Sequence, residues 1–282
     1  MDPLSIAIIS GTVGGVAGVF SKEVWDLGRN WIHSFYKDHK PKAIAKAEQN
    51  SLDFLVQLAQ RVKTLEEQGE QQEKVIEDSL NHPEFSALIQ KAIIASAQTE
   101  DNQKHQILAN LVADRLTKES ESLFALSSQL ACDAIAKLNL RQLKILGLLS
   151  TLWFIRPTGY PLPTLEKEQF TKFYMDFLTP ILNKYKGLTF HKWDLLHLES
   201  LSCAKWDPLV SRDLKKVLTP SERSEDLDFT IFAETEVGKE IKRMWESDLQ
   251  QCTPTTLGHL IGTYVTSNLV NVDISLEGWG EL

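Results

Sequence analysis

The sequence predicts a mainly α-helical protein with an N-terminal membrane-inserting helix, a cytoplasmic helical body and a small winged-helix-like α/β part at the C-terminus. Three observations lead to this fold class. Residues 3–20 carry no charge, apolar residues then recur at helical spacing as far as residue 155, and short elements follow a turn-rich break. The domains expected from them are residues 1–21, 22–40, 41–156 and 157–282.

The N-terminal segment PLSIAIISGTVGGVAGVF (residues 3–20) has eighteen uncharged residues, four of which are glycine. On a helix its small residues gather on one side, and its larger apolar residues gather on the other. The small residues are Ala7, Ser10, Gly11, Gly14, Gly15 and Gly18, and the larger ones include Ile8, Ile9, Val13 and Val16. A stripe of small residues suits close helix packing in a lipid bilayer.

The length of this segment is close to what a membrane span requires. Eighteen helical residues cover roughly 27 Å, and the hydrocarbon core is about 30 Å thick. Slight thinning of the bilayer would make up the difference. The basic residues that follow, from Lys22 to Lys42, place the bulk of the chain in the cytoplasm. Met1 and Asp2 provide none of the basic residues that open a secretory signal peptide.

Two other interpretations of this segment are weaker. A buried helix of a water-soluble domain would contain four glycines, each costing roughly 1 kcal/mol against alanine. A dinucleotide-binding turn would need the GxGxxG pattern, but Val13 and Val16 occupy the second and third glycine positions when the pattern starts at Gly11.

Residues 22–40 are expected to form an amphipathic helix along the membrane surface. Aromatic residues recur there at helical spacing among basic ones. Aromatic rings are enriched at the membrane–water interface. We therefore expect Trp25, Trp31 and Tyr36 to anchor this helix there.

Residues 41–156 are expected to form the helical, oligomerising body. Apolar residues follow helical spacing in five segments, at 41–68, 84–99, 103–117, 119–138 and 140–155. The last segment is apolar on nearly every side beyond Lys144, which predicts a central buried helix.

The break at residues 156–163, RPTGYPLP, marks the expected domain boundary. Helices are predicted at 165–185, 190–202 and 254–270. Residues 227–232, LDFTIF, alternate like a strand before a short helix that Thr235 caps. This order of elements underlies the winged-helix prediction.

Composition narrows the function classes. The chain has 282 residues with a net charge of −8, which excludes a generally basic nucleic-acid binder. Its three cysteines are odd in number and far apart in the sequence, which favours free thiols over a disulfide framework.

Enzyme chemistry has little support in the sequence. The seven histidines form no HExxH motif, and the chain has no CxxC, GxSxG or phosphate-binding GxxxxGK[ST] motif. The acidic cluster at residues 224–228 fits a solvated loop better than a cation site. We therefore predict no catalytic residues, no metal site and no cofactor.

Three stretches carry a family resemblance: DNQKHQILANLVADRLTKES at 101–120, LNLRQLKILGLLSTL at 138–152, and the pair FAETEVGKEI and CTPTTLGHLIG near 232–241 and 252–262. They resemble the bacterial Abi-alpha abortive-infection proteins. The overall plan is similar to the membrane-channel effectors of Hailong-type antiphage systems. That resemblance implies a gating DNA oligonucleotide made by a partner nucleotidyltransferase.

The predicted function is an antiphage effector that forms a homo-oligomeric pore in the bacterial inner membrane. The small-residue stripe would pack the pore helices, and Ile8, Ile9, Val13 and Val16 would form a hydrophobic gate. Candidate ligand-binding residues are Arg141, Lys144, Lys172, Lys184, Lys186 and Arg212. The alternative is a soluble winged-helix-type adaptor without membrane activity, and an enzyme with an unrecognised site is a third reading.

Overall fold

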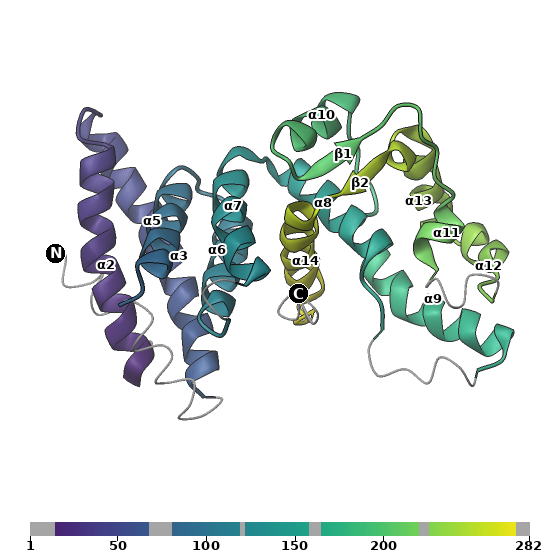
Figure 1. Cartoon of the computed structure of the whole chain (residues 1–282), viewed down its shortest axis with the longest axis horizontal. Helices are drawn as coiled ribbons and strands as arrows, with labels where there is room; N and C mark the ends of the chain where they lie inside the picture. The colour runs from purple at the N-terminus through teal and green to yellow at the C-terminus, as the bar shows by residue number, and fades with distance from the viewer. Residues whose placement is uncertain (1–14, 68–80, 119–121, 158–164, 220–225, 275–282) are drawn as a thin grey trace. The chain divides into compact units, whose positions relative to one another are not determined.

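The computed structural model describes residues 15–67, 81–118, 122–157, 165–219 and 226–274 (Figure 1). Over these residues the protein has twelve α-helices and two short strands, which confirms the mainly α fold class. The chain divides into two compact units. Unit 1 runs as far as Lys137, and unit 2 begins at Leu138.

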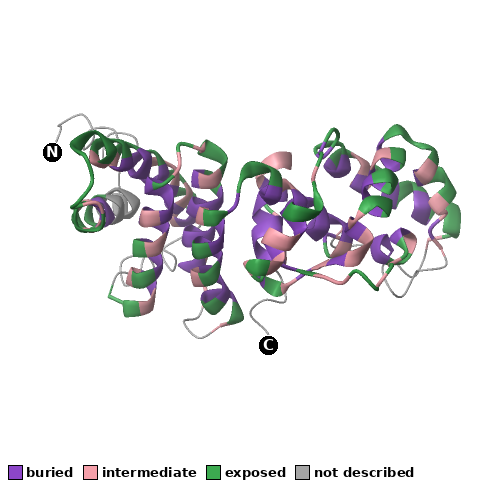
Figure 2. Ribbon diagram, turned by 90° about the horizontal axis from the view of Figure 1, so that it is seen from above, coloured by how far each residue is buried: buried purple, intermediate pink, exposed green. Residues whose placement is uncertain are grey.

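Unit 1 is a bundle of helices. They are α2 (Gly15–Phe35), α3 (Pro41–Glu66), α5 (Pro83–Ala97), α6 (Asn102–Arg115) and α7 (Leu123–Lys137). Helix α3 packs against α2, α5 and α6, and α7 packs against α5 and α6. Phe54, Leu55 and Ile89 are completely buried between these helices. Figure 2 shows the buried residues in purple on the inward-facing sides of the helices.

Local sequence signals explain where these helices begin. Pro41 and Pro83 open α3 and α5, where the missing N–H of proline has no cost. Asp101 caps α6, because its carboxylate accepts hydrogen bonds from the backbone N–H groups of Gln103 and Lys104.

Unit 2 contains the remaining helices and both strands. Its helices are α8 (Leu140–Trp153), α9 (Lys167–Asn183), α10 (Lys192–Ser200), α11 (Leu214–Leu218), α12 (Phe229–Glu234), α13 (Glu236–Ser247) and α14 (Thr256–Val270), with the 3-10 helix η3 (Leu249–Gln251). Strands β1 (Ala204–Trp206) and β2 (Cys252–Pro254) pair antiparallel, with Lys205 opposite Thr253.

The pattern Thr-x-x-Gly occurs at the start of both α13 and α14. Thr235 Oγ1 accepts a hydrogen bond of 2.9 Å from the N–H of Gly238, and Thr255 Oγ1 accepts one of 3.1 Å from Gly258. A Cβ atom on either glycine would overlap a backbone carbonyl, that of Phe232 or Cys203. The threonine therefore caps the helix, and the glycine permits close backbone approach.

Helices α8 and α14 form the central pair of unit 2. A Cβ on Gly262 of α14 would overlap the carbonyl group of Leu146 on α8, so the two backbones are very close. Leu146, Leu148, Leu149 and Leu152 of α8 are completely buried. The prediction of a buried helix over 140–155 is therefore confirmed.

Two expectations are corrected by the structure. The boundary between units lies at residue 137 rather than at 156, because α8 packs against α14 and belongs to unit 2. Residues 229–234, which fall largely within the expected strand 227–232, form helix α12, which Asp228 caps through the N–H of Thr230. The short alternating pattern was outweighed by this cap and by burial of Phe232.

Within the described ranges, no helix combines the length and the apolar character needed to cross a membrane. Most of the predicted membrane segment, residues 3–14, lies outside those ranges. Its last part, residues 15–20, belongs to the backbone of α2.

Candidate functional site

Unit 1 contains a groove of about 430 Å³ between α2, α5 and α7. Ligand pockets typically have volumes of about 300–1,000 Å³. Helix α2 contributes Trp31, Ser34 and Phe35, α5 contributes Gln90, Lys91, Ile94, Ala95 and Gln98, and α7 contributes Cys132, Asp133, Ala136 and Lys137.

The groove combines apolar and polar side chains. Trp31 and Phe35 lie one turn apart on α2, and Phe35 remains 53% exposed. Lys91 Nζ donates to Asp133 Oδ2 at 2.6 Å, which joins α5 to α7 beside the groove. Aromatic surface with a few charged and amide groups suits a ligand that is partly apolar and partly polar.

The predicted pore residues fall mainly outside the described ranges. Ala7, Ile8, Ile9, Ser10, Gly11, Val13 and Gly14 precede the first described residue. Gly15, Val16 and Gly18 form part of the first turns of α2.

The three predicted interface anchors have different surroundings. Trp25 is only 6% exposed, so its ring contacts the protein interior and is not available to lipid. Helix α2 buries this face because it packs against α3 and α5. Trp31 lines the groove. Tyr36 is half-buried, its ring meets Phe35 and His39 edge-on at 5.0 Å, and burial raises its pKa.

The six predicted ligand-binding cations all belong to unit 2. Lys144 is half-buried on α8, whereas Lys172, Lys184 and Lys186 are exposed on α9 and directly after it. Arg212 Nη1 donates to the Gln250 carbonyl at 3.2 Å, and its guanidinium lies 5.8 Å from the ring centre of Trp153. These contacts give Arg212 a role within the fold.

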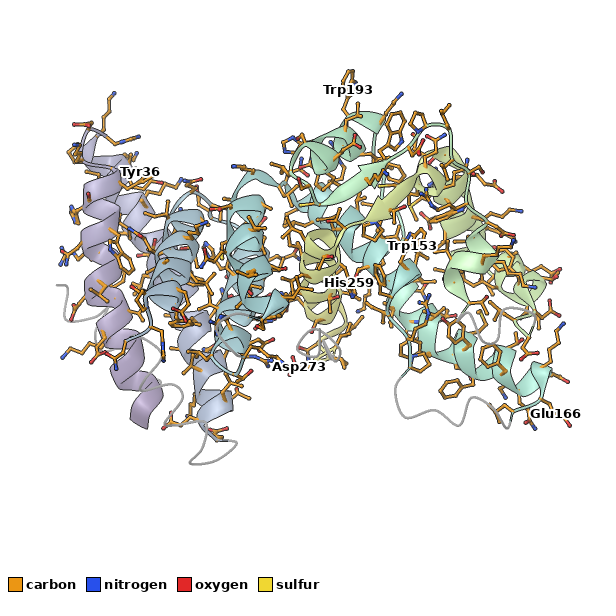
Figure 3. The ribbon with its side chains drawn as sticks, viewed as in Figure 1. Tyr36, Trp153, Glu166, Trp193, His259 and Asp273 are labelled. Atoms are coloured by element: carbon orange, nitrogen blue, oxygen red, sulfur yellow. The ribbon has the colours of Figure 1, made fainter. Side chains whose placement is uncertain are left out.

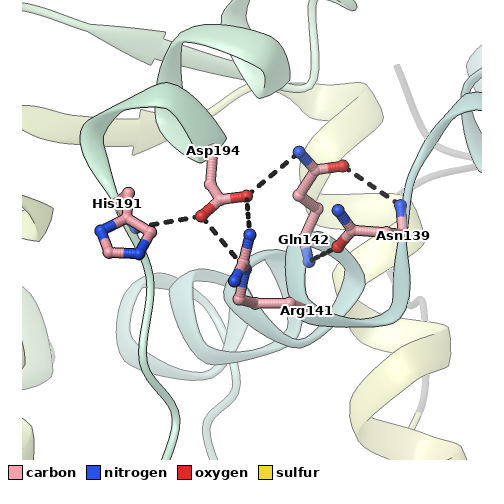
Figure 4. Close-up of polar contacts among 5 residues, drawn as sticks. All are labelled: Asn139, Arg141, Gln142, His191 and Asp194. Carbon is pink, nitrogen blue, oxygen red and sulfur yellow. Dashed lines mark hydrogen bonds and ion pairs between the residues drawn. The ribbon is translucent and has the colours of Figure 1, made fainter.

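Arg141 binds a buried carboxylate (Figure 4). Asp194 has a side chain only 5% exposed, accepts a hydrogen bond of 3.2 Å from Arg141 Nη2, and forms an ion pair with Arg141 Nε, also at 3.2 Å. It also accepts from Gln142 Nε2 at 3.3 Å and from the backbone N–H of His191 at 3.0 Å. Asn139 and Gln142 form a capping box in the same cluster. The cluster clamps the start of α10 to the start of α8, so Arg141 acts structurally.

A serine–histidine pair lies between α8 and α14. Ser150 Oγ is 2.7 Å from His259 Nδ1 and 3.1 Å from Thr263 Oγ1. Burial lowers the pKa of His259 to about 4, so the ring is neutral near pH 7. Ser150 is completely buried, with no surface for a substrate to reach. The pair therefore forms a polar contact between two helices.

Within the described part of the chain, no three His, Cys, Asp or Glu side chains converge in a way that could hold a metal ion. The three cysteines are free thiols, and each is buried.

The model of an uncharacterised protein family matches residues 18–223, which is well over half of the chain. The chain therefore belongs to this uncharacterised family. The matched region begins within α2 and continues into unit 2. No curated protein and no solved structure gave a significant match.

Several residues of the groove could not have been predicted as a site. Lys91 and Asp133 are 42 positions apart, and only the packing of α7 on α5 joins them. The recurrence of Trp31 and Phe35 at helical spacing was the one available signal, and it indicated a shared face without its partner.

Proposed function

We propose that the protein is a membrane-acting antiphage effector of bacteria. In this proposal the N-terminal segments of several copies form a pore in the inner membrane, and a ligand on the cytoplasmic body controls its opening. The resemblance to Abi-alpha proteins and to Hailong-type channel effectors suggests this class. The contribution of the structure is a physical connection between the segment and the body.

That connection is helix α2, and the proposal rests on the observation that this one helix reaches from the uncharged segment to the groove. The helix contains the end of the uncharged segment at residues 15–20 and the groove residues Trp31 and Phe35. A helix is rigid over this length, so a displacement at the groove would be transmitted to the segment.

Unit 1 holds α2 through an apolar face. Val24 and Ile32 are completely buried, and a Cβ on Gly28 would lie 2.6 Å from Ile93 Cδ1 on α5. A ligand that preferred one position of α2 over another would shift the equilibrium between closed and open pores by its difference in affinity.

The groove is the preferred ligand site in this proposal, because it contacts α2 directly. The ligand implied by the resemblance is an oligonucleotide made by a partner nucleotidyltransferase. The cations predicted from the sequence all belong to unit 2 and do not line the groove, and Arg141 and Arg212 already have partners within that unit.

Dye release from liposomes of bacterial lipid tests the pore directly. We expect the full chain to release dye, and Gly14→Leu to abolish release, because leucine blocks close packing of the small-residue stripe. Val19→Leu is the matched control, since it adds a leucine to the same segment at a position outside both the small-residue stripe and the gate. Equal release from the wild type and Gly14→Leu would refute packing through this stripe. The absence of release from the wild type would refute the pore.

The second candidate is a soluble winged-helix-type adaptor, with its partner bound to unit 2. The observation in its favour is exposed apolar surface: Trp193 is 80% exposed and Leu209 is 94% exposed. Figure 3 shows Trp193 projecting outward from α10. Liposome flotation separates the two candidates, because the adaptor would stay at the bottom of the gradient.

A further inference from the structure

The lining of the groove contains polar groups that are paired with each other and polar groups that are open to a ligand. Lys91 Nζ and Asp133 Oδ2 are joined at 2.6 Å. The side chains of Ser34, Gln90 and Gln98 are exposed, and within the described residues none of them is hydrogen-bonded to another residue. Their hydroxyl and amide groups are therefore available to a bound molecule.

The groove carries little net charge. Among its described lining residues the charged ones are Lys91, Asp133 and Lys137, and the contact between Lys91 and Asp133 cancels two of these three charges. A protein that holds a phosphate chain neutralises several phosphates with several cations. We therefore expect the part of the ligand inside the groove to be uncharged.

Aromatic rings form the α2 side of the groove. Trp31 and Phe35 lie one turn apart, and Ile94 and Ala95 of α5 add apolar surface to the same lining. Phe35 is 53% exposed, so its ring is open to contact. Aromatic side chains stack well on planar rings. This surface favours a flat ligand.

The size of the groove favours a small molecule over a protein partner. Along α5, from Gln90 to Gln98, the lining extends about 12 Å at 1.5 Å per residue. A stable protein partner contacts about 20–30 residues on each side, whereas twelve residues line this groove. Its volume of about 430 Å³ lies in the range of small-ligand pockets.

We propose that the groove binds a nucleobase, stacked on Trp31 and Phe35 and hydrogen-bonded at its edge by Gln90 or Gln98, with the phosphate outside. The inference rests on the proposed function, and it names the part of the ligand that the groove recognises. The edge of a base carries both donors and acceptors, and a carboxamide supplies both in return, whereas an ionised phosphate oxygen only accepts.

Calorimetric titration of the full chain in detergent tests this with two probes of equal length. One is a short single-stranded DNA that contains all four bases, and the second is an abasic strand with the same backbone. We expect the abasic probe to bind at least about ten times more weakly, because it keeps the phosphates and lacks the rings. Equal affinity of the two probes, or no binding of either, would overturn the proposal. Competition by free nucleosides then shows whether a mononucleotide suffices or a strand is needed, and either result supports the base site.

Substitutions in the groove provide an independent test. Trp31→Ala should weaken binding of the base-containing probe about tenfold, and Trp31→Phe should keep most of the affinity, because stacking needs a ring. The double variant Gln90→Ala/Gln98→Ala should weaken binding as well, because it removes the amides that contact the base edge. Trp193→Ala is the matched control, since Trp193 is 80% exposed and belongs to unit 2. Unchanged affinity of Trp31→Ala, or an equal loss with Trp193→Ala, would overturn the proposal.

The salt dependence of binding separates bases from phosphates. Binding through a base should weaken less than about tenfold between 50 mM and 200 mM salt, whereas a complex with about 6–10 phosphate contacts weakens by about 10³–10⁵. A loss in the second range would assign the binding to phosphates and overturn the proposal.

The two proposals fail in different ways. Base-dependent binding with no dye release from liposomes would leave the nucleobase site standing and remove the pore. Dye release from a chain that binds neither probe would leave the pore standing and remove this site.

Discussion

Ser150 on α8 and His259 on α14 share a hydrogen bond of 2.7 Å between Oγ and Nδ1, although 109 positions separate them in the sequence. The ring of Phe154 covers the imidazole, with centroids 4.1 Å apart. The histidine is therefore held as a neutral group within the central helix pair of unit 2.

This environment predicts that stability falls in acid. The pKa of His259 is about 4 in the folded protein against an ordinary value of 6.5, because burial disfavours the charged ring. Between these values the unfolded chain binds more protons than the folded one, so stability decreases as the pH falls from 6.5 toward 4. The full loss is about 3 kcal/mol, at about 1.4 kcal/mol per pKa unit.

Urea unfolding from pH 7 to pH 4 measures this loss. His259→Gln should remove most of the histidine's part of the pH dependence, whereas His39→Gln, at an exposed position, should keep the wild-type slope. Parallel slopes for the wild type and His259→Gln would show that the charged ring is tolerated in the folded state.

Alanine substitutions should lower stability more at glycines that contact backbone, Gly258 and Gly262, than at Gly28, which contacts a side chain. A Cβ at Gly258 or Gly262 meets a carbonyl group, which cannot move without shifting a helix or strand, so we expect losses of about 2 kcal/mol or more. At Gly28 the Cβ meets only the flexible end of Ile93, and alanine has the higher helix propensity. Gly28→Ala should change stability by less than about 1 kcal/mol. Thermal unfolding of the three variants provides the comparison.

Loss of the buried carboxylate should weaken unit 2. Asp194→Ala leaves the N–H group of His191 and the amide of Gln142 without their acceptor, and it removes the partner of Arg141. We expect a cost of about 3 kcal/mol in urea unfolding. Asp176→Ala, at an exposed position on α9, should change stability by less than about 0.5 kcal/mol. Similar midpoints for the two variants would contradict the clamp.

The tryptophans of α2 should differ in their contribution to folding. Trp25→Ala empties a core position and should cost about 3–5 kcal/mol. Trp31→Ala removes a half-exposed ring beside the groove and should cost about 1 kcal/mol. Chemical unfolding followed by circular dichroism tests both. A small effect of Trp25→Ala would point to a ring outside the core of unit 1.

The cysteines should be unreactive in the native protein. Burial raises the pKa of Cys203 and of Cys252 to about 12, and it raises that of Cys132 as well. Because the thiolate is the reactive form, we expect almost no labelling by a thiol reagent at pH 8 in the native protein. All three thiols should react in urea. Rapid labelling of one thiol in native buffer would reveal local opening around it.

The sequence by itself determined the mainly α class and most of the helices. Pro41, Pro83 and Asp101 mark helix starts through local chemistry, and apolar spacing marks the faces that become buried. These signals act within one turn or one helix, so they are visible before the chain folds. The small-residue segment at 3–20 is likewise a property of the sequence, and its insertion into lipid stays a prediction.

Only the tertiary structure decided where the units divide, that Trp25 is buried, and which groups meet across helices. Lys91 reaches Asp133, Arg141 reaches Asp194 and Ser150 reaches His259 because helices distant in the sequence pack against each other. Helical spacing defines the face of one helix but contains no information about which helix covers that face. The choice of partner depends on how the apolar surfaces of each whole unit are buried together.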